Sequence, residues 1–160
     1  MTPEHLHLLL NHLPIAGSAF AALALLGGLI FRNAAVCRTG MALTVAATLL
    51  TPLVLESGEK ARIGIVVATG AVPLDPSASS WIHEHEERAE VLAVVLYATL
   101  IAAAGALALS WKKPAWTLPL GGAMLLLCLA CLGGGVWTAA AGGKIRHTEL
   151  RPGVAPPHDD

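Results

Sequence analysis

The chain has 160 residues, of which 55% are hydrophobic and only 13% are charged, and its formal net charge is −1. Soluble domains carry about 25% charged residues. The composition, with a mean hydropathy of +0.66, therefore excludes an ordinary soluble domain. The sequence has no basic patch, so no nucleic-acid partner is expected. The remaining class is an integral membrane protein.

Four charge-free apolar stretches follow one another, at residues 13–31, 39–55, 91–111 and 114–143. A helix needs about 20 apolar residues to cross a bilayer, and the second, shortest stretch is expected to extend at either end. The sequence therefore predicts an all-α membrane protein, a four-transmembrane-helix bundle in a single domain over residues 1–147. Its helices are expected at about 6–31, 37–56, 82–111 and 115–141, with an outer loop at 57–81 and a loose tail at 148–160.

The first two helices contain proline. The opening "MTPEHLHLLLNH" has no Lys or Arg, so the first helix is not expected to be a cleaved signal peptide. Pro14 is expected to weaken the first turn of this helix and to free a carbonyl group. The pair Thr51-Pro52 is expected to kink the second helix.

The long connection contains an apolar run too short to cross a bilayer. This run, in "ESGEKARIGIVVATGAV", either continues the second helix outward or lies along the interface. Ser79 or Ser80 is expected to cap the third helix near Trp81. Gly142 and Gly143 are expected to end the fourth helix.

Basic residues mark the two short connections, which carry no acidic residue: Arg32, Arg38, Lys112 and Lys113. The positive-inside rule places these connections in the cytoplasm. Both termini and the long loop are then expected on the outer side of a bacterial inner membrane. The tryptophans fit interfacial belts, with Trp111 and Trp116 inside and Trp81 and Trp137 outside.

With this orientation, all the histidines fall on the outer side: His5, His7, His12, His83, His85, His147 and His158. Glu56 and Glu59 end the second helix on the same side. A solvated edge would not need such an asymmetry. The sequence therefore favours a site at the outer end of the bundle.

His12 is the most informative of these residues. It lies with Asn11 in an otherwise apolar run, and an ionisable group within a transmembrane segment indicates function. The alternative is an interfacial histidine that is hydrogen-bonded to a neighbouring helix. In "IHEHEERAE", His85 is expected to face the bundle and His83 to face outward, because a two-residue step turns a helix by about 200°. The glutamates are expected to be solvated, with one of them able to orient a histidine.

Two chemistries suit histidines on facing helices. One is bis-histidine ligation of haem b, which needs two neutral imidazoles and apolar walls. Its propionates would meet cations at the outer surface, for which the candidates are Lys60, Arg62, Arg88, Lys144 and Arg146. The alternative is a Zn or Cu site of histidine and carboxylate, although the HExxH pattern is absent. Cys128 and Cys131 form a CxxC pair that either binds a soft metal or packs as small apolar residues.

Four motifs occur in order along nearly the whole chain: "HLLLNHLPI" with His7, His12 and Pro14, "SGEKA" at 57–61, "EHEE" at 84–87, and "GGKIRHTE" at 142–149. In this the chain resembles a family of small bacterial four-helix membrane proteins of unknown function, some of which are predicted to bind haem. Leu8 departs from the pattern, which has proline after the first histidine. The resemblance implies the four-helix membrane fold and singles out His7, His12, His85 and His147.

The leading hypothesis is a b-type membrane cytochrome. His12 and His85 are the expected axial pair, with His7 and His147 as a second pair or as support, so one haem is expected and two are allowed. The protein would be a relay or subunit, not an enzyme by itself, between an outer-side redox protein such as a cytochrome c and a larger membrane complex. Its glycine-rich faces would also suit a homo-oligomer in the lipid.

The competing hypothesis is a non-redox accessory or assembly subunit. Its histidines would bind a metal ion or hold the outer loops together. A quinol-oxidising enzyme would further need an acid–base relay, for which Glu56 and Glu59 are the candidates. Colour separates these classes, because only a haem protein has a Soret band.

Overall fold

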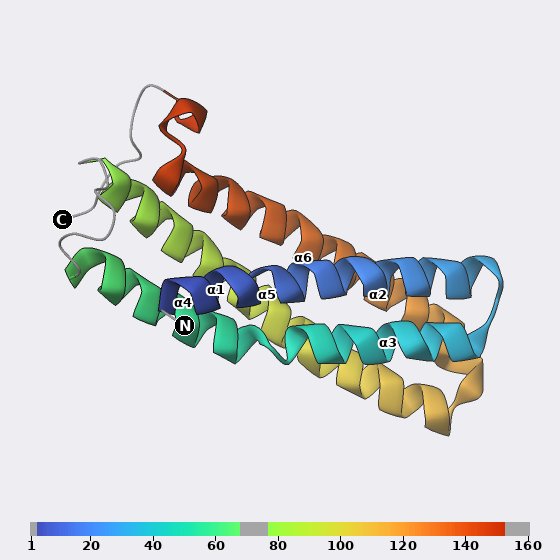
Figure 1. The fold of residues 1–160 in the computed structure, drawn as a ribbon. Coiled ribbons are helices and arrows are strands. Elements are labelled where there is room, and N and C mark those ends of the chain that lie inside the picture. Colours follow the sequence, from blue (N-terminus) through green and yellow to red (C-terminus); the bar gives the residue numbers. More distant parts are fainter. Residues whose placement is uncertain (1–2, 68–76, 153–160) are drawn as a thin grey trace.

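A computed structural model describes residues 3–67 and 77–152 of the chain (Figure 1). The described part is helical and contains no strand. Its α-helices are α1 (Pro3–Leu10), α2 (His12–Ile30), α3 (Ala34–Thr48), α4 (Thr51–Val67), α5 (Ala78–Lys112) and α6 (Thr117–Arg146). Short 3-10 turns, Pro114–Trp116 and Thr148–Leu150, precede and follow α6.

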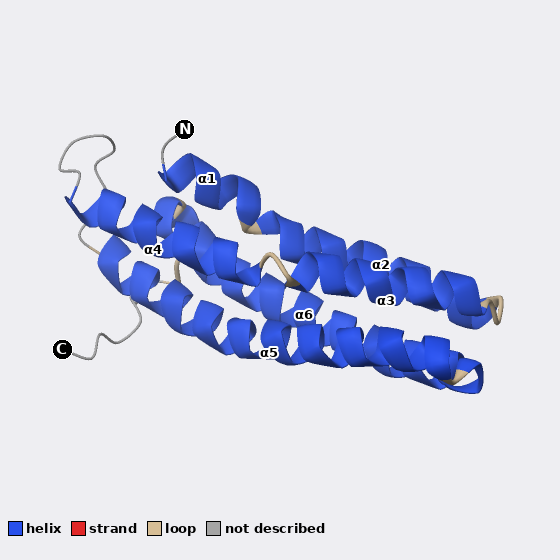
Figure 2. Cartoon of the chain, turned by 90° about the horizontal axis from the view of Figure 1, so that it is seen from below, coloured by secondary structure: helices blue, strands red, loops and turns tan. Residues whose placement is uncertain are grey.

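The helices combine into long apolar spans. Within the described residues, four are long and apolar enough to cross a membrane: His5–Ile30, Ala34–Arg62, Ala78–Lys112 and Pro114–Arg146. They pack side by side as one elongated bundle (Figures 1 and 2). The predicted all-α four-helix membrane bundle is therefore confirmed, and the chain is a multi-pass membrane protein.

The first and second spans are each broken near a proline (Figure 2). One break lies at Asn11, just before Pro14, and the other lies between α3 and α4, just before Pro52. Pro52 has no N–H to donate to the Thr48 carbonyl. The Thr51 hydroxyl donates to that carbonyl instead, at 2.7 Å. The predicted break at the Thr51-Pro52 pair is confirmed, and its freed backbone group has a partner.

Helix α4 extends beyond the predicted end of the second helix. Helix α4 continues to Val67 and so occupies the first part of the predicted loop 57–81. Glu56 pairs with Lys60 and Glu59 with Arg62 along its surface, and such pairs at i,i+4 and i,i+3 support a helix. The apolar run therefore continues the second span outward, which was one of the two alternatives.

The predicted start of the third helix and the predicted end of the fourth helix were wrong. Helix α5 begins at Ala78, after the N-cap Ser77, and neither Ser79 nor Ser80 caps it. Ser77 makes no capping bond but accepts a hydrogen bond from Arg151 at 2.7 Å, which ties the end of the described chain to the start of α5. Helix α6 continues through Gly142 to Arg146, because this glycine serves the packing of a neighbouring ring and does not end the helix.

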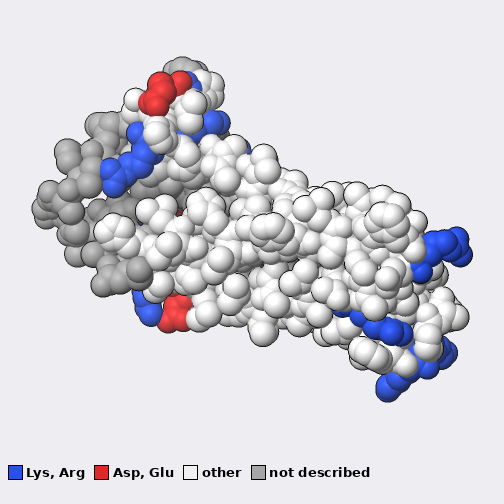
Figure 3. Space-filling model, turned by 45° about the vertical axis from the view of Figure 1, so that its right-hand side comes forward, with Lys and Arg blue, Asp and Glu red and all other residues white. Residues whose placement is uncertain are grey.

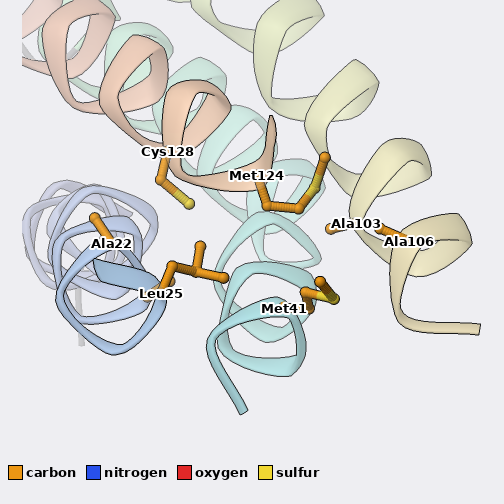
Figure 4. Packing of buried hydrophobic residues seen from close by; sticks show 8 residues of the cluster. Ala22, Leu25, Met41, Ala103, Ala106, Met124 and Cys128 are labelled. Atoms are coloured by element: carbon orange, nitrogen blue, oxygen red, sulfur yellow. The ribbon is translucent and has the colours of Figure 1, made fainter. Parts of the chain in front are cut away.

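The hydrophobic core lies where α2, α3, α5 and α6 meet (Figure 4). Its largest fully buried side chains include Leu25 and Met41. The cluster comprises Ala21, Ala22, Leu25, Met41, Ala103, Ala106, Met124 and Cys128. Small residues let these helices approach closely, as membrane helices require when the lipid tails are as apolar as the side chains.

Buried hydroxyl and thiol groups link the helices within this bundle. Cys128 lies 3.3 Å from the Thr44 hydroxyl on α3, and Cys131 lies 3.4 Å from the Thr99 hydroxyl on α5. The two cysteines thus face different helices, which fits packing better than a shared metal. Other polar residues within the spans are buried as well: Ser18, Thr48 and Thr51.

The two ends of the bundle differ in charge (Figure 3). We call the end with the two short turns the basic end, since it holds Arg32, Arg38, Lys112 and Lys113. We call the opposite end the histidine end; it comprises α1, the last turns of α4, the first turns of α5 and the last turns of α6. The first and last described helical turns both lie at the histidine end (Figure 1).

Candidate functional site

His7 joins α1 to α4 at the histidine end. Its Nδ1 lies 3.2 Å from the Ser57 hydroxyl, and that hydroxyl donates its own proton to the Val54 carbonyl at 2.9 Å. With its proton on the Val54 carbonyl, the hydroxyl oxygen accepts from the imidazole, and we assign the proton of the neutral ring to Nδ1 on this arrangement. The lone pair is then on Nε2, the nitrogen left for a ligand.

His85 joins α5 to α6 in a comparable way. Its Nδ1 lies 3.0 Å from the Thr138 carbonyl, which can only accept. The proton is therefore again on Nδ1 and the lone pair on Nε2. His83 instead points away and pairs with Glu87 at 3.3 Å. The prediction that His85 faces the bundle and His83 does not is confirmed.

Each of these rings packs against a glycine on the neighbouring helix. A Cβ at Gly58 would lie 3.0 Å from the His7 ring, and a Cβ at Gly142 would lie 3.1 Å from the His85 ring. Contacts this short require the neighbour to move. The two glycines therefore make room for the rings, and a larger residue would displace them.

The two rings lie near each other across the histidine end. His7 is within electrostatic range of both His85 and His12. Among the described residues, the side-chain contacts of the two rings are made through Nδ1, and the Val54 backbone also lies near the His7 ring. Two imidazoles held through Nδ1 thus come from separate helices to one region.

The other two predicted ligands lie farther out. His12 is exposed on the first turn of α2, and the side-chain oxygen of the adjacent Asn11 is buried, with no partner among the described residues. His147 is exposed beyond α6 and hydrogen-bonds Glu149 at 2.9 Å. Its recorded partner is thus a surface carboxylate and not another histidine.

The cations predicted to meet haem propionates are mostly held in ion pairs with glutamates. Lys144 lies over the Trp81 ring, with its Nζ 4.5 Å from the centroid, and Arg146 is exposed. Trp81 is buried, so it does not lie in an interfacial belt as predicted. The ion pairs are Lys60–Glu56 at 2.6 Å, Arg62–Glu59 at 2.7 Å, Arg62–Glu86 at 2.9 Å and Arg88–Glu84 at 2.6 Å.

Sequence reasoning missed the residues that support the rings: Ser57, Gly58, Thr138 and Gly142. Three of them lie in the motifs "SGEKA" and "GGKIRHTE", in which Gly142 was expected only to end a helix. In the structure each motif supplies a glycine against a histidine ring. The Thr138 carbonyl is a backbone group, so no side-chain pattern could have indicated it.

The donor set fits a group that needs two imidazoles. Among the described residues, no group of three His, Cys, Asp or Glu side chains is arranged to hold a metal ion. Zinc sites use three or four protein ligands, whereas a bis-histidine haem uses two. The buried Trp81 Nε1, which lacks a partner in the described part, is an available donor for a carboxylate at this end.

Comparison with known proteins adds no relative: no protein-family model, curated protein or solved structure matches the chain. The family resemblance is therefore carried by the short motifs alone. The four-helix membrane fold does not depend on it, because the helices and their hydropathy are observed directly. The function has to be inferred from the geometry of the histidine end.

Proposed function

We propose that this chain binds one b-type haem at the histidine end, with His7 and His85 as its axial ligands, and acts as an electron-transfer relay or subunit. The observation that carries the proposal is the shared state of the two rings. Each Nδ1–H is held by an acceptor, at 3.2 and 3.0 Å, and each Nε2 is left for a ligand. Metal-binding histidines are oriented in this way in proteins generally.

A haem is favoured over a zinc or copper ion by the number of preformed ligands. Two imidazoles from α1 and α5 suffice for the two axial positions of a haem. A closed zinc site needs about four ligands, which the described residues do not bring together. When bound, haem supplies a carrier that takes up and releases one electron.

The residues of this chain would orient and surround the group. Ser57 and Thr138 fix the ring orientation, and Gly58 and Gly142 allow the rings to lie close to their neighbouring helices. Arginines and lysines at the same end, now paired with glutamates, would supply the charge that balances the carboxylates of a haem. If a haem propionate replaced a glutamate as the partner of one of these cations, the net charge of the pair would stay the same.

The position of the site indicates the partner class. The positive-inside rule assigns the basic end to the cytoplasm of a bacterial inner membrane, so the histidine end and both termini face outward. A single haem near one membrane face cannot carry electrons across the bilayer. A relay to an outer-side redox protein, such as a cytochrome c, or to a larger membrane complex fits this position.

The test is a reduced-minus-oxidised visible spectrum of protein purified in detergent after expression with ample haem. The wild-type protein should give a b-type α-band, and His7→Ala and His85→Ala should each lose it. His83→Ala and His147→Ala are matched controls that should keep the full spectrum. A colourless wild-type protein, or loss of haem in the control variants alone, would overturn the proposal.

The axial pair His12–His85 expected from the sequence stays a prediction that the same spectrum tests. If His12 is an axial ligand, His12→Ala loses the α-band and His7→Ala keeps it. If His7 is the ligand, the result is the reverse. Since His12 is exposed and His7 is half-buried with a fixed tautomer, we expect the second outcome.

A structural role is the second candidate, and it has its own support. His7 and His85 each connect two helices through a hydrogen bond. In a scaffold subunit these bonds alone would hold the histidine end together. A colourless wild-type protein that loses thermal stability in both His7→Ala and His85→Ala would favour this function.

A further inference from the structure

A groove opens on the lipid-facing side of the bundle near the basic end, between α3 and α5. Its volume is about 400 Å³. Both helices contribute side chains to its lining. The lining residues are Ala35, Arg38, Thr39, Ala42, Leu107 and Trp111.

Arg38 is fixed at the edge of this groove. Its Nη2 donates to the Ser110 carbonyl at 2.7 Å and its Nε donates to the Ser110 hydroxyl at 3.3 Å. The guanidinium carbon lies 4.4 Å from the centroid of the Trp111 ring. The guanidinium is thus held over an indole, and within the described residues its Nη1 has no hydrogen-bond partner.

No carboxylate of the described residues neutralises this charge. Arg38 lies about one turn, roughly 6 Å, inside the start of α3. The acidic side chains that the structure describes are in the half of the molecule toward the histidine end: Glu56, Glu59, Glu84, Glu86, Glu87, Glu90 and Glu149. A cation at membrane depth is stabilised by pairing with another charge or with a backbone carbonyl. The Ser110 carbonyl partners Nη2 only, so the positive charge of Arg38 remains available to an anion from outside the described chain.

We infer that the groove binds one anionic phospholipid, whose phosphate is held by Arg38 and the neighbouring Lys112 and Lys113. Arginine on an aromatic face presents its remaining N–H groups in the fork that suits phosphate oxygens. One acyl chain lies over Ala35, Thr39 and Ala42, where small side chains leave space. Basic residues at a membrane surface attract acidic lipids in general; here the fixed guanidinium adds a defined position.

A second groove in the same molecule serves as an internal contrast. It lies between α2 and α3, has a volume of about 280 Å³, and is lined by apolar residues only, among them Phe20 and Ala46. Lipid tails fill it without regard to the headgroup. Selectivity for an anionic headgroup is therefore a property of the α3–α5 groove alone.

Native mass spectrometry of the detergent-purified full chain tests this site. The probes are phosphatidylglycerol and phosphatidylcholine with identical acyl chains. Wild-type protein should retain the phosphatidylglycerol adduct about tenfold more than the phosphatidylcholine adduct. Arg38→Gln should abolish this preference, and Lys112→Gln with Lys113→Gln should reduce it severalfold.

A pair of groove-filling variants keeps the test independent of the contacts that Arg38 makes to α5. Ala42→Leu blocks the acyl-chain path with the arginine in place, and should lower the phosphatidylglycerol adduct about as much as Arg38→Gln. Ala46→Leu fills the apolar groove and should leave the preference unchanged. Equal retention of both lipids by the wild type, or an unchanged preference in both Arg38→Gln and Ala42→Leu, would overturn the inference.

Discussion

At the basic end, α2, α3, α5 and α6 pack around side chains with no solvent exposure, such as Leu25 and Met41. At the histidine end, α4 packs mainly on α1 and only slightly on α5. Polar contacts connect the elements there, including His7–Ser57 and Arg62–Glu86. Close apolar packing thus stabilises one half of the molecule, while the other half positions chemically active groups. Changes in one half should leave the property of the other half intact.

The largest effect is expected from a cavity in the packed half. Leu25 is fully buried, and Leu25→Ala should lower the free energy of unfolding by about 3 kcal/mol. Thermal unfolding in detergent, followed by circular dichroism, measures this change. Leu126, which is 69% exposed to lipid, is the control, and Leu126→Ala should change stability little. At temperatures where the protein stays folded, the haem spectrum of Leu25→Ala should match the wild type; a loss there would contradict the division between the halves.

A larger side chain beside a histidine ring should instead lower the affinity for haem. Gly142→Val places a side chain against the His85 ring and should weaken haem binding about 100-fold. Haem titration followed by Soret absorbance measures the affinity. Gly133→Val introduces the same residue on the same helix where nothing lies within 4 Å of the Cβ, and should bind haem normally. Equal losses in both variants would indicate general damage to α6.

A smaller effect should follow from loss of the acceptor that orients His7. Ser57→Ala leaves the ring in place without its hydrogen bond at 3.2 Å, and should weaken haem binding about tenfold. Ser57→Thr keeps a hydroxyl and should restore part of the affinity. An unchanged affinity in Ser57→Ala would mean that Ser57 does not orient the ring.

The smallest effect is expected at the exposed pair Glu149–His147. The pKa of Glu149 is held below the usual value for a carboxyl group, first by a hydrogen bond from the Glu149 backbone N–H and then by the hydrogen bond with His147. Any stability from this carboxylate is present above its unfolded pKa of about 4.3 and is lost as the pH falls through the lower folded pKa. The carboxylate is ionised throughout about pH 5 to pH 7, and an exposed pair contributes little. The Tm of Glu149→Gln should therefore equal that of the wild-type protein at each pH in this range. A Tm that falls over this range in wild-type protein, but not in Glu149→Gln, would contradict this surface role.

Much of the fold could be predicted from the sequence, because its signals are local. Charge-free stretches identify the spans, and prolines at 14 and 52 mark the breaks. Helix ends were less predictable. Gly142 resembles a helix stop in sequence, but the ring of His85 from another helix packs against it. A tertiary contact thus changed the meaning of a local signal.

The candidate site could be predicted in part for the same reason. Helical periodicity was enough to favour His85 over His83. The sequence ranked His12 ahead of His7 because His12 lies deeper in an apolar run, whereas the hydrogen bond of His7 to Ser57 depends on how α1 packs on α4. The burial of Trp81 and the ion pairs of Arg62 and Arg88 depend on which helices become neighbours, and composition contains no such information.

The paired breaks in the first two spans have a mechanical consequence. Both occur at a similar level of the bundle, so α1 and α4 form a short arm that is separated by a break from α2 and from α3 (Figure 1). His7 rides on this arm, whereas His85 is anchored to the α5–α6 pair. A rigid group ligated by both rings would therefore link the α1–α4 arm to the α5–α6 pair. Amide hydrogens of α1 and α4 would then exchange more slowly in the protein with this group bound than in the protein without it. Those around Leu25 would exchange at the same rate in both.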